Sequence, residues 1–496
     1  MSYQVPQHIS NDKIFIVNRS EIKGRLDPKM ALYNRKVQNW LYPKVRLKDI
    51  LLSKPQYGAA ESGIIRNDPM SPRYIRITDI DEYGLISHDD LGATANTIED
   101  QYILHENDIL IARSGATVGK AYIHKACPYT CFFAGYLIRF IINPIKALPD
   151  YVFTFTQSNT YKEWVNAIQR PSGQPNINAE EYQSLEIPLP PSDIQNEVVS
   201  IIQIAYSEKQ EKESEAQKLL ESIDTYLLNE LGIILPESKT DLIDRVFYVS
   251  YNNLTGKRLD PKKYSLQVQQ LLDSINAARF ETRTLRSFVR DSCSGDWGIE
   301  ESDTIPKGYT RCLTLRATEI DNQYNLNIDI SKAKHRLIKD ERLERMNMSE
   351  NDIIVEKSGG SDDQPVGRVA IIDKDLLKSY TIAFSNFLMK IKVSGINPDY
   401  LYCFLKTMYN IGVTGSMQSQ TNGIRNLILD EFLSQPIVVP PSEKQQEIVD
   451  SVYAMREKAK SLQEEGKNIL EQAKREVERI IIGRKGINKE DLVWPT

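Results

Sequence analysis

The sequence has few cysteines and no long apolar run, and these absences narrow the classes of protein it can encode. Only five of its 496 residues are cysteines, an odd and low number that argues for a reducing compartment without a disulfide framework. The N-terminus has no apolar stretch of signal-peptide length, and no segment approaches the roughly 20 apolar residues of a membrane span. We therefore expect a cytoplasmic protein with no membrane association.

The chain also lacks an excess of positive charge. It has 62 Lys and Arg against 67 Asp and Glu, for a net charge of −5. A strongly basic balance would by itself point to nucleic acid, so any such contact here must come from local basic patches. The composition is ordinary for a globular protein, and at roughly 100–200 residues per domain the length predicts two to four domains.

The chain repeats itself once. The matching blocks, in chain order, are GRLDPK at 24–29 and KRLDPK at 257–262, RYIRITDIDEYGLI from Arg73 and RCLTLRATEIDNQYNL from Arg311, ENDILIARSGATVGKAYI from Glu106 and ENDIIVEKSGGSDDQPVGRVAII from Glu350, LPDYVFTF from Leu148 and NPDYLYCF from Asn397, and IPLPPSDIQNEVVSII from Ile187 and IVVPPSEKQQEIVDSV from Ile437. Their order is the same in both halves, and the spacing grows along the chain as insertions in the second half would produce. This repeat is too long for a solenoid, so whole domain-plus-helix units are duplicated.

Each unit begins with a strand-rich part and ends with a long helix. Short β-prone runs such as YIRIT and DILIA, broken by Gly, Pro, Asn and Asp, indicate an α+β domain. Ser192 and Ser442 each follow Pro-Pro and are followed three residues later by Gln195 and Gln445, which predicts a capping box at the start of each helix. The Pro-Pro pair prevents the helix from starting earlier.

The apolar positions of the two long helices predict how they pack. In the second helix they recur at steps of four and three from Ile448 to Ala473, which is a coiled-coil seam, and Gly232 and Gly483 stand where C-terminal caps belong. The first helix starts the same way but is polar over 207–215. Helices of about 40 residues are about 60 Å long. The pattern also fits a generic oligomerisation stalk, but the duplication favours antiparallel pairing about a pseudo-two-fold axis, with one globular domain held at each end.

No catalytic motif is complete. Gly115 to Lys120 resembles a phosphate loop, but it has three residues between its glycines, and Ala121 stands in place of the Ser or Thr that would hold magnesium, so we interpret it as a turn between strands. Cys127, Cys131 and His124 lack a second ligand pair at zinc spacing, so we interpret the cysteines as buried strand residues. The motifs of a methyltransferase and of a metal nuclease are absent. We expect no catalytic residue, no metal and no cofactor.

These blocks resemble those of type I restriction-modification specificity subunits, over nearly the whole chain. The most specific feature is the repeated Pro-Pro helix start, together with GQPNINAEEYQSLEIPLPPSDIQ from Gly173; the second copy is looser and carries the insertion GSDDQP at Gly360. The resemblance implies an α+β fold with two target recognition domains, each reading half of a split sequence in double-stranded DNA. It also implies a non-catalytic subunit that docks two methyltransferase subunits and acts with motor-nuclease subunits. The bounds that we expect are 1–190 and 237–440 for the two domains, 191–236 and 441–484 for the spacer helices, and 485–496 for a tail.

The resemblance requires basic and amide side chains that can contact phosphates and base edges. Three kinds of loop supply them. The candidates are Arg113, Ser114, Lys120, Lys357, Ser358 and Arg368 after the DIL strand, Arg170, Ser172, Gln174, Asn176, Gln418, Gln420, Asn422 and Arg425 before the helix, and Arg73, Arg76, Arg311 and Arg316. Three alternatives stay open: a subunit of a related defence or methylation-only system, a structural coiled-coil adaptor, and a self-sufficient enzyme.

Overall fold

The structure is a computed structural model that divides into two compact units. Unit 1 comprises Met1–Lys212 and Gln463–Thr496, and unit 2 comprises Glu213–Leu462. The residues that the structure describes are 16–17, 19, 27–38, 40–87, 91–169, 175–236, 246–251, 263–321, 326, 328–361, 364–421 and 423–482. Each unit therefore contains one strand-rich domain and half of each of the two long helices.

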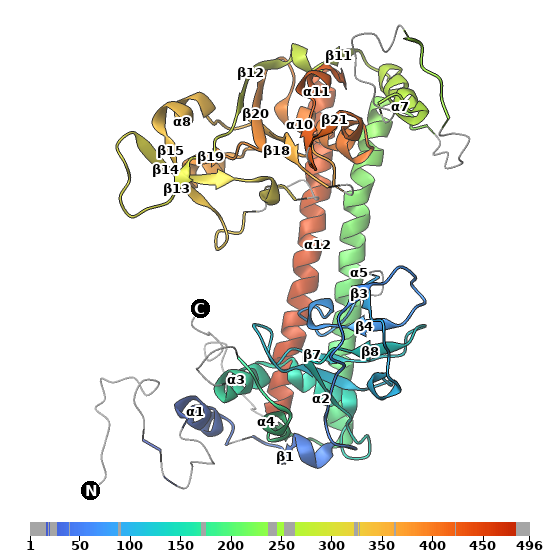
Figure 1. Ribbon diagram of the computed structural model, residues 1–496, viewed down its shortest axis with the longest axis vertical. Helices are drawn as coiled ribbons and strands as arrows, with labels where there is room; N and C mark the ends of the chain where they lie inside the picture. The colour runs from blue at the N-terminus through green and yellow to red at the C-terminus, as the bar shows by residue number, and fades with distance from the viewer. Residues whose placement is uncertain are drawn as a thin grey trace. The chain divides into compact units, whose positions relative to one another are not determined.

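Unit 1 is built on short strands and short helices (Figure 1). Its elements are α1 (Pro28–Lys36), β1 (Lys44–Arg46), η2 (Leu47–Ile50), β2 (Gln56–Tyr57), β3 (Ile64–Ile65), β4 (Arg73–Ile75), η3 (Ile77–Asp79), β5 (Ala93–Thr94), η4 (Asp100–Tyr102), β6 (Ile109–Ala112), β7 (Ala121–Ile123), β8 (Cys131–Phe133), β9 (Leu137–Phe140), α2 (Pro149–Thr156), α3 (Asn159–Ile168), α4 (Ala179–Gln183), β10 (Glu186–Pro188) and the first part of the long helix α5 (Ser192–Leu231).

Unit 2 repeats this plan with longer strands. Its elements, after the second part of α5, are α7 (Leu266–Asn276), β11 (Thr282–Thr284), η6 (Leu285–Ser287), β12 (Val289–Ser294), β13 (Ile299–Glu300), β14 (Tyr309–Leu315), η7 (Ala317–Glu319), β15 (His335–Lys339), α8 (Asp340–Met346), β16 (Ile353–Glu356), β17 (Ser358–Gly359), β18 (Val369–Ile371), α9 (Lys374–Ser379), β19 (Ile382–Phe384), β20 (Leu388–Val393), α10 (Pro398–Asn410), η8 (Thr414–Ser416), β21 (Gln418–Thr421), β22 (Ile424–Leu427), α11 (Leu429–Ser434), β23 (Pro436–Val438) and the first part of α12 (Ser442–Ile482). The helices α2 and α10 begin at equivalent prolines, Pro149 and Pro398, whose fixed φ suits the first turn of a helix.

The two domains share one sheet topology, which confirms the internal repeat. Unit 1 has four-stranded sheets in the orders β2-β9-β6-β7 and β3-β5-β4-β8, and unit 2 has β12-β20-β16-β18 and β13-β15-β14-β19. In each second sheet one pair is parallel, β4 with β8 and β14 with β19. A two-stranded pair, β1-β10 or β11-β23, accompanies them, and unit 2 adds a third sheet, β17-β22-β21.

The strand registers correct one detail of the sequence alignment. Arg73 lies opposite Cys131 in β8, and the matching position opposite Ile382 in β19 is Leu313. Arg311 therefore lies two residues before the position equivalent to Arg73. The two arginines that occupy equivalent positions in the two units are Arg76 and Arg316, and each precedes a short 3-10 helix.

The long helices start one residue earlier than the capping-box prediction requires. Pro191 accepts the first helical hydrogen bond from the backbone N–H of Gln195, so the N-cap is Pro191 and Ser192 is the first helical residue. A proline has no N–H for a capping glutamine to accept, so this prediction is wrong. The Gln195 side chain instead accepts from the N–H of Leu148 at 2.9 Å and donates to the carbonyl of Pro190 at 2.8 Å.

The second helix start uses the same arrangement, so Ser442 and Gln445 do not form a capping box either. Pro441 accepts from the N–H of Gln445, whose side chain accepts from the N–H of Asn397 at 2.9 Å and donates to Pro440 at 2.8 Å. Each buried glutamine thus joins the start of a long helix to the start of the helix of its own domain, α2 or α10.

The halves of α5 and α12 pair antiparallel within each unit, as predicted. In unit 2 the Lys444 ammonium lies 2.5 Å from the Glu230 carboxylate, and Ala216 packs with Ala459 and Leu462. In unit 1 Lys212 lies 2.9 Å from Glu465. Gly466 faces Lys209 there so closely that an added Cβ would lie 3.4 Å from the Lys209 backbone.

The predicted glycine cap can be checked at the C-terminal end of α5 but not at that of α12. Gly232 ends α5 with φ of +70°, as predicted for a C-terminal cap, whereas Gly483 lies outside the described residues. Among the described residues, no helix combines the length and the apolar content that crossing a membrane requires.

The long helices contribute directly to the core of each unit. In unit 1, Val198 and Ile202 of α5 and Leu470 and Val477 of α12 belong to the same buried cluster as the strands β6 and β9 and the helices α2 and α3. In unit 2, the corresponding cluster contains Leu227 of α5 and Ile448 of α12. The helices are therefore part of both domains rather than separate stalks attached to them.

Candidate nucleic-acid interface

The loop after β6 and the loop after β16 are the first candidate surface. Both connect antiparallel strands, β6 to β7 and β16 to β18, and both turn on a glycine with positive φ, Gly119 at +89° and Gly367 at +108°. No helix follows Lys120, so the segment 115–120 has no helix N-terminus to bind phosphate. The interpretation of this segment as a turn between strands is confirmed.

The basic residue that ends each loop points into its own domain. Lys120 donates to the carbonyl of Ile80, and Arg368 donates at 2.6 Å to the carbonyl of Ile320, the equivalent position in unit 2. Arg368 is only 7% exposed. Both side chains thus hydrogen-bond the residue that follows a 3-10 helix. For the buried Arg368 the assignment to DNA contacts is corrected to a structural role, whereas for the half-buried Lys120 it stays a prediction.

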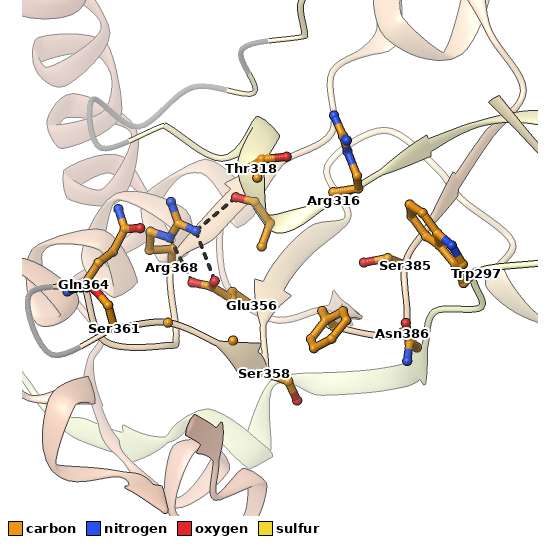
Figure 2. Close-up of a pocket in the computed structure, with 14 residues that line it drawn as sticks. Trp297, Arg316, Thr318, Glu356, Ser358, Ser361, Gln364, Arg368, Ser385 and Asn386 are labelled. Carbon is orange, nitrogen blue, oxygen red and sulfur yellow. Dashed lines mark hydrogen bonds and ion pairs between the residues drawn. The ribbon is translucent and has the colours of Figure 1, made fainter. Parts of the chain in front are cut away.

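In unit 2 this contact is part of a buried ion pair. The Arg368 guanidinium contacts both carboxylate oxygens of Glu356, at 2.8 and 3.0 Å, and also donates to the carbonyl of Ala317 at 3.0 Å (Figure 2). Burial alone would lower the pKa of Arg368, but the hydrogen bond and charge of Glu356 outweigh it and the pKa is raised. The position of Glu356 is Ala112 in unit 1, so Lys120 has no equivalent carboxylate from that strand.

Among the arginines around the short 3-10 helices, one is buried and two are partly accessible. Arg73 is 1% exposed and donates to the carbonyl of Ser87 at 2.6 Å. The prediction that Arg73 contacts DNA directly is therefore wrong. Arg76 and Arg316 each pair with a carboxylate three residues later, Asp79 or Glu319. Their side chains remain 42% and 29% exposed, so both guanidinium groups reach the surface.

Arg311, at the start of β14, is more exposed than either of them. Its side chain is 57% exposed and pairs with Glu301. An exposed ion pair of this kind is weak, so the guanidinium can exchange Glu301 for a phosphate at little cost.

In unit 2 the structure brings two of the predicted loops together. Ser358 and Gly359 of β17 pair with Asn426 and Arg425 of β22, which in turn pairs with β21. Gln420 on β21 is exposed, whereas Arg425 is 8% exposed. The Gln418 side chain donates to the carbonyl of Gly415 at 2.9 Å, and Lys357 donates to the Ser294 hydroxyl at 2.9 Å. Gln420 is therefore the most accessible polar side chain of this group, whereas Ser358 is half-buried and its hydroxyl donates to the Asn426 side chain at 2.7 Å.

Unit 1 joins the same two loops by a single bridge. Ser114 lies opposite Asn176, which is exposed, and the N–H of Gly115 donates to the carbonyl of Pro175 at 3.1 Å. The Arg113 guanidinium lies 4.9 Å from the centre of the Tyr57 ring, a cation–π contact. Four candidates lie outside the described residues: Arg170, Ser172, Gln174 and Asn422.

A pocket of about 760 Å³ in unit 2 collects residues from several of these loops. Arg316, Ser358 and Arg368 line it, together with Trp297, Asn386 and Phe387, which the sequence did not single out. Figure 2 shows Trp297 and Asn386 on one side of the pocket and Gln364 and Ser361 on the other. An exposed aromatic residue next to an amide, in a turn between strands, is the pattern that could have revealed Phe387 and Asn386.

One group of possible metal ligands comes together among the residues that the structure describes. His124, Cys127 and Cys131 place their ligand atoms within 4.8 Å of one another. Cys131 lies on strand β8 and is buried, as expected of a strand cysteine, but Cys127 lies in the preceding loop and is only half-buried.

The repeated domain is that of a known family. The model for the type I restriction modification DNA specificity domain matches residues 74–222 and again residues 324–472, which together make up more than half of the chain. The chain therefore belongs to this family. Each match covers most of one strand-rich domain and runs into the long helix that follows it.

Comparison with solved structures gives distant likenesses over most of the chain. A chain from a study of complex assembly and conformational transition of the type I R-M system is 14% identical with a TM-score of 0.48, covering 89% of this chain and 96% of the other. The S subunit from M. genitalium is 11% identical with a TM-score of 0.40, covering 90% and 97%. The HsdS subunit from Thermoanaerobacter tengcongensis is 13% identical with a TM-score of 0.37, covering 90% and 97%. No curated protein matches, and the family assignment rests on the family model.

Proposed function

We propose that this chain is the DNA-reading subunit of a type I restriction-modification complex, and that it recognises an asymmetric target in two parts. The observation that carries the proposal is that the DNA specificity domain occurs twice, once for each strand-rich domain. Two readers on one chain call for two recognised half-sequences. The halves should differ because the loops that would read them differ in sequence and in structure.

In unit 2 the proposed reading surface is the pocket around Arg316 and the β21–β22 hairpin. Arginine can contact guanine with two hydrogen bonds, and asparagine or glutamine can do the same with adenine. Arg316 and Asn386 at the pocket and Gln420 on the hairpin supply these groups on neighbouring loops. Trp297 and Phe387 add apolar surface that can contact a thymine methyl group or a sugar.

In unit 1 the proposed reading surface is simpler. Arg76, Arg113, Ser114 and Asn176 supply its donors and acceptors. Exposed Arg311 and half-buried Lys357 of unit 2 are better suited to phosphates, which position the protein without carrying sequence information.

The other parts of the proposal concern the complex. The paired halves of α5 and α12 would set the gap between the half-sequences and offer docking surface to two methyltransferase subunits, with motor-nuclease subunits joining through them. The chain itself would bind neither methyl donor nor ATP and would catalyse no reaction. The DNA that it would recognise is genomic DNA, so we propose that the protein acts in the cytoplasm.

Mapping methylated adenines in the host genome tests this proposal. With the gene intact, we expect methylation at a split asymmetric sequence with a fixed gap, and with the gene deleted, methylation at those sites should vanish. Complementation with the Arg316→Ala chain should relax only one half of the sequence. Methylation that is unchanged by the deletion would contradict the proposal.

Three alternatives have their own readouts. A subunit of a methylation-only system would give the same map with no restriction of unmethylated phage DNA. A coiled-coil adaptor would protect no two-part sequence when the assembled complex is footprinted on genomic fragments. An enzyme complete in one chain would methylate or cleave DNA when the purified chain alone receives methyl donor, ATP and magnesium.

A further inference from the structure

We propose that His124, Cys127 and Cys131 form a zinc site that ties together the two four-stranded sheets of unit 1. His124 directly follows β7, which belongs to the sheet β2-β9-β6-β7, and Cys131 is the first residue of β8, which belongs to the sheet β3-β5-β4-β8. Cys127 lies in the connection between them. An ion held by all three residues would join the two sheets at the point where the chain crosses from one to the other.

The geometry of the cluster fits a tetrahedral ion. The Cys127 and Cys131 sulfurs lie 3.6 Å apart. Two thiolates at the usual zinc–sulfur distance of about 2.3 Å on a tetrahedral ion lie about 3.8 Å from each other, whereas a disulfide requires about 2.05 Å. All three ligand atoms lie within 4.8 Å of one another, so only a small adjustment is needed to close on one ion.

The surroundings of the cluster resemble the second shell of a metal site. One ring nitrogen of His124, Nδ1, lies 2.9 Å from the Tyr122 hydroxyl, and this contact fixes the orientation of the ring. His124 and Cys131 are 5% and 1% exposed, while Cys127 is half-buried. Water can therefore reach the ion only from the side of Cys127, where it would complete the fourth position.

The second unit shows that the fold itself does not need these residues. The strand registers place Ile372 at the position of His124 and Ile382 at the position of Cys131. Both isoleucines are buried in an apolar cluster, and the connection between their strands contains the helix α9, which adds Leu376 and Leu377 to that cluster. Unit 2 thus joins its two sheets by apolar packing, and unit 1 has three soft metal ligands at the same place.

The ligand types select the class of ion. Thiolates and imidazole favour zinc over calcium or magnesium, which take oxygen ligands. Two thiolates also neutralise a divalent ion, so that the buried site carries no net charge. Arg66 and Arg73 approach the same loop through the ring and the hydroxyl of Tyr129.

The first experiment measures the metal bound to the purified chain by inductively coupled plasma mass spectrometry. We expect about one zinc per chain after dialysis, and less than about a tenth of that in Cys127→Ser and Cys131→Ser. Cys293→Ser is the matched control, because Cys293 is also half-buried but lies on β12 of unit 2, and it should retain the metal. Zinc retained in Cys131→Ser, or absent from the wild-type chain, would overturn the proposal.

A second measurement does not depend on how the variants fold. A chelator first removes zinc from the wild-type chain, and cobalt is then added in its place. Thiolate ligands give bound cobalt an intense charge-transfer band in the near ultraviolet. We expect this band, and its loss when zinc is added back. Cobalt uptake without the band would contradict thiolate ligation. A chain mass lower by two hydrogens, which indicates a disulfide between Cys127 and Cys131, would replace the zinc site by a redox pair and so overturn it.

Discussion

The two units of this chain have the same sheet topology but use different interactions at equivalent positions. Beside the loop after the DIL strand, unit 2 has the buried pair Glu356–Arg368, and unit 1 has Ala112 and Lys120. At the contact between the long helices, unit 2 has Ala216 against Ala459, and unit 1 has Gly466 against Lys209. The same backbone topology thus accepts a buried ion pair or an alanine and a lysine beside this loop, and either two alanines or a glycine and a lysine between the helices.

The comparison distinguishes residues whose interactions are the same in both units from residues whose interactions differ between them. Gln195 and Gln445 make the same two hydrogen bonds in both units, and Lys120 and Arg368 hold equivalent carbonyls. The segments that follow the start of α2 and α10 differ: unit 1 has the short helix α2 and then the separate helix α3, whereas unit 2 has the longer helix α10 and then the 3-10 helix η8. A shared framework with divergent loops is what two readers of different half-sequences require.

The largest effect is expected from breaking the ion pair that unit 1 lacks. Glu356→Ala leaves the Arg368 guanidinium buried without its carboxylate, and removal of one partner of a buried pair typically costs about 3–5 kcal/mol. We expect the midpoint of urea unfolding of unit 2 to fall accordingly. Glu356→Ala combined with Arg368→Lys recreates the Ala112 and Lys120 arrangement and should recover part of the loss. A single variant as stable as wild type would show that the pair is dispensable.

The second prediction concerns Lys406 of α10, whose counterpart in unit 1 is Gln157. Burial, and next the charge of Arg456, lowers the pKa of Lys406 to about 7. Between pH 7 and its ordinary pKa of 10.5 the unfolded chain then binds more protons than the folded chain, so this group makes stability rise with pH.

The contribution of Lys406 should amount to about 2 kcal/mol between pH 7 and pH 9. Lys406→Gln, which installs the residue of unit 1, should remove this rise. The measurement is the difference between the unfolding free energies of wild type and variant at each pH, because other titrating groups cancel in it. A difference that does not change with pH would refute the lowered pKa.

The third prediction tests whether the equivalent arginines read separate half-sequences. Arg76→Ala and Arg316→Ala should each cost about 1–3 kcal/mol of DNA binding by the assembled complex and relax one half of the target only. Arg46→Ala is the matched control, because Arg46 also precedes a 3-10 helix and pairs with a carboxylate three residues later, Asp49. Equal losses in all three variants would point to a general loss of positive charge.

The smallest effect is expected at the contact between the helices of unit 1. Gly466→Ala installs the residue that unit 2 has at Ala216. Alanine favours a helix over glycine by about 0.8–1 kcal/mol, and the new methyl group would lie 3.4 Å from the Lys209 backbone, at the limit of ordinary contact. We expect a stability change of less than about 1 kcal/mol, measured by thermal unfolding. A large loss of stability would show that the helices of unit 1 pack too closely to accept the methyl group that the helices of unit 2 accept.

The sequence predicts most of the fold because the fold depends on local patterns that occur twice. The duplication, the strand-rich domains, the helix starts after Pro-Pro and at Pro149, and the turn at Gly119 all follow from spacing, from proline and from glycine. The capping boxes failed by one residue, because a proline carbonyl can begin a helix although proline cannot take part in the reciprocal bond.

The candidate interface is harder to predict, because a basic side chain looks the same in sequence whether it faces solvent or a carbonyl. Arg73, Lys120 and Arg368 satisfy carbonyls at Ser87, Ile80 and Ile320, which lie far from them in the chain or on another loop. No periodicity reveals such partners. Trp297 and Asn386 were missed for the opposite reason, because a single aromatic or amide residue in a turn gives no pattern until the fold brings several together.

The core of unit 1 closes only when the end of the chain arrives. Leu470, Ala473, Val477 and Ile481 of α12 belong to the same buried cluster as Ile109 and Tyr151 of the first domain. During synthesis the first domain therefore leaves the ribosome before the residues that complete it, and it must wait through the whole of the second. A stop codon before position 470 would leave the N-terminal domain incomplete, so that only chains that include α12 yield a first reader.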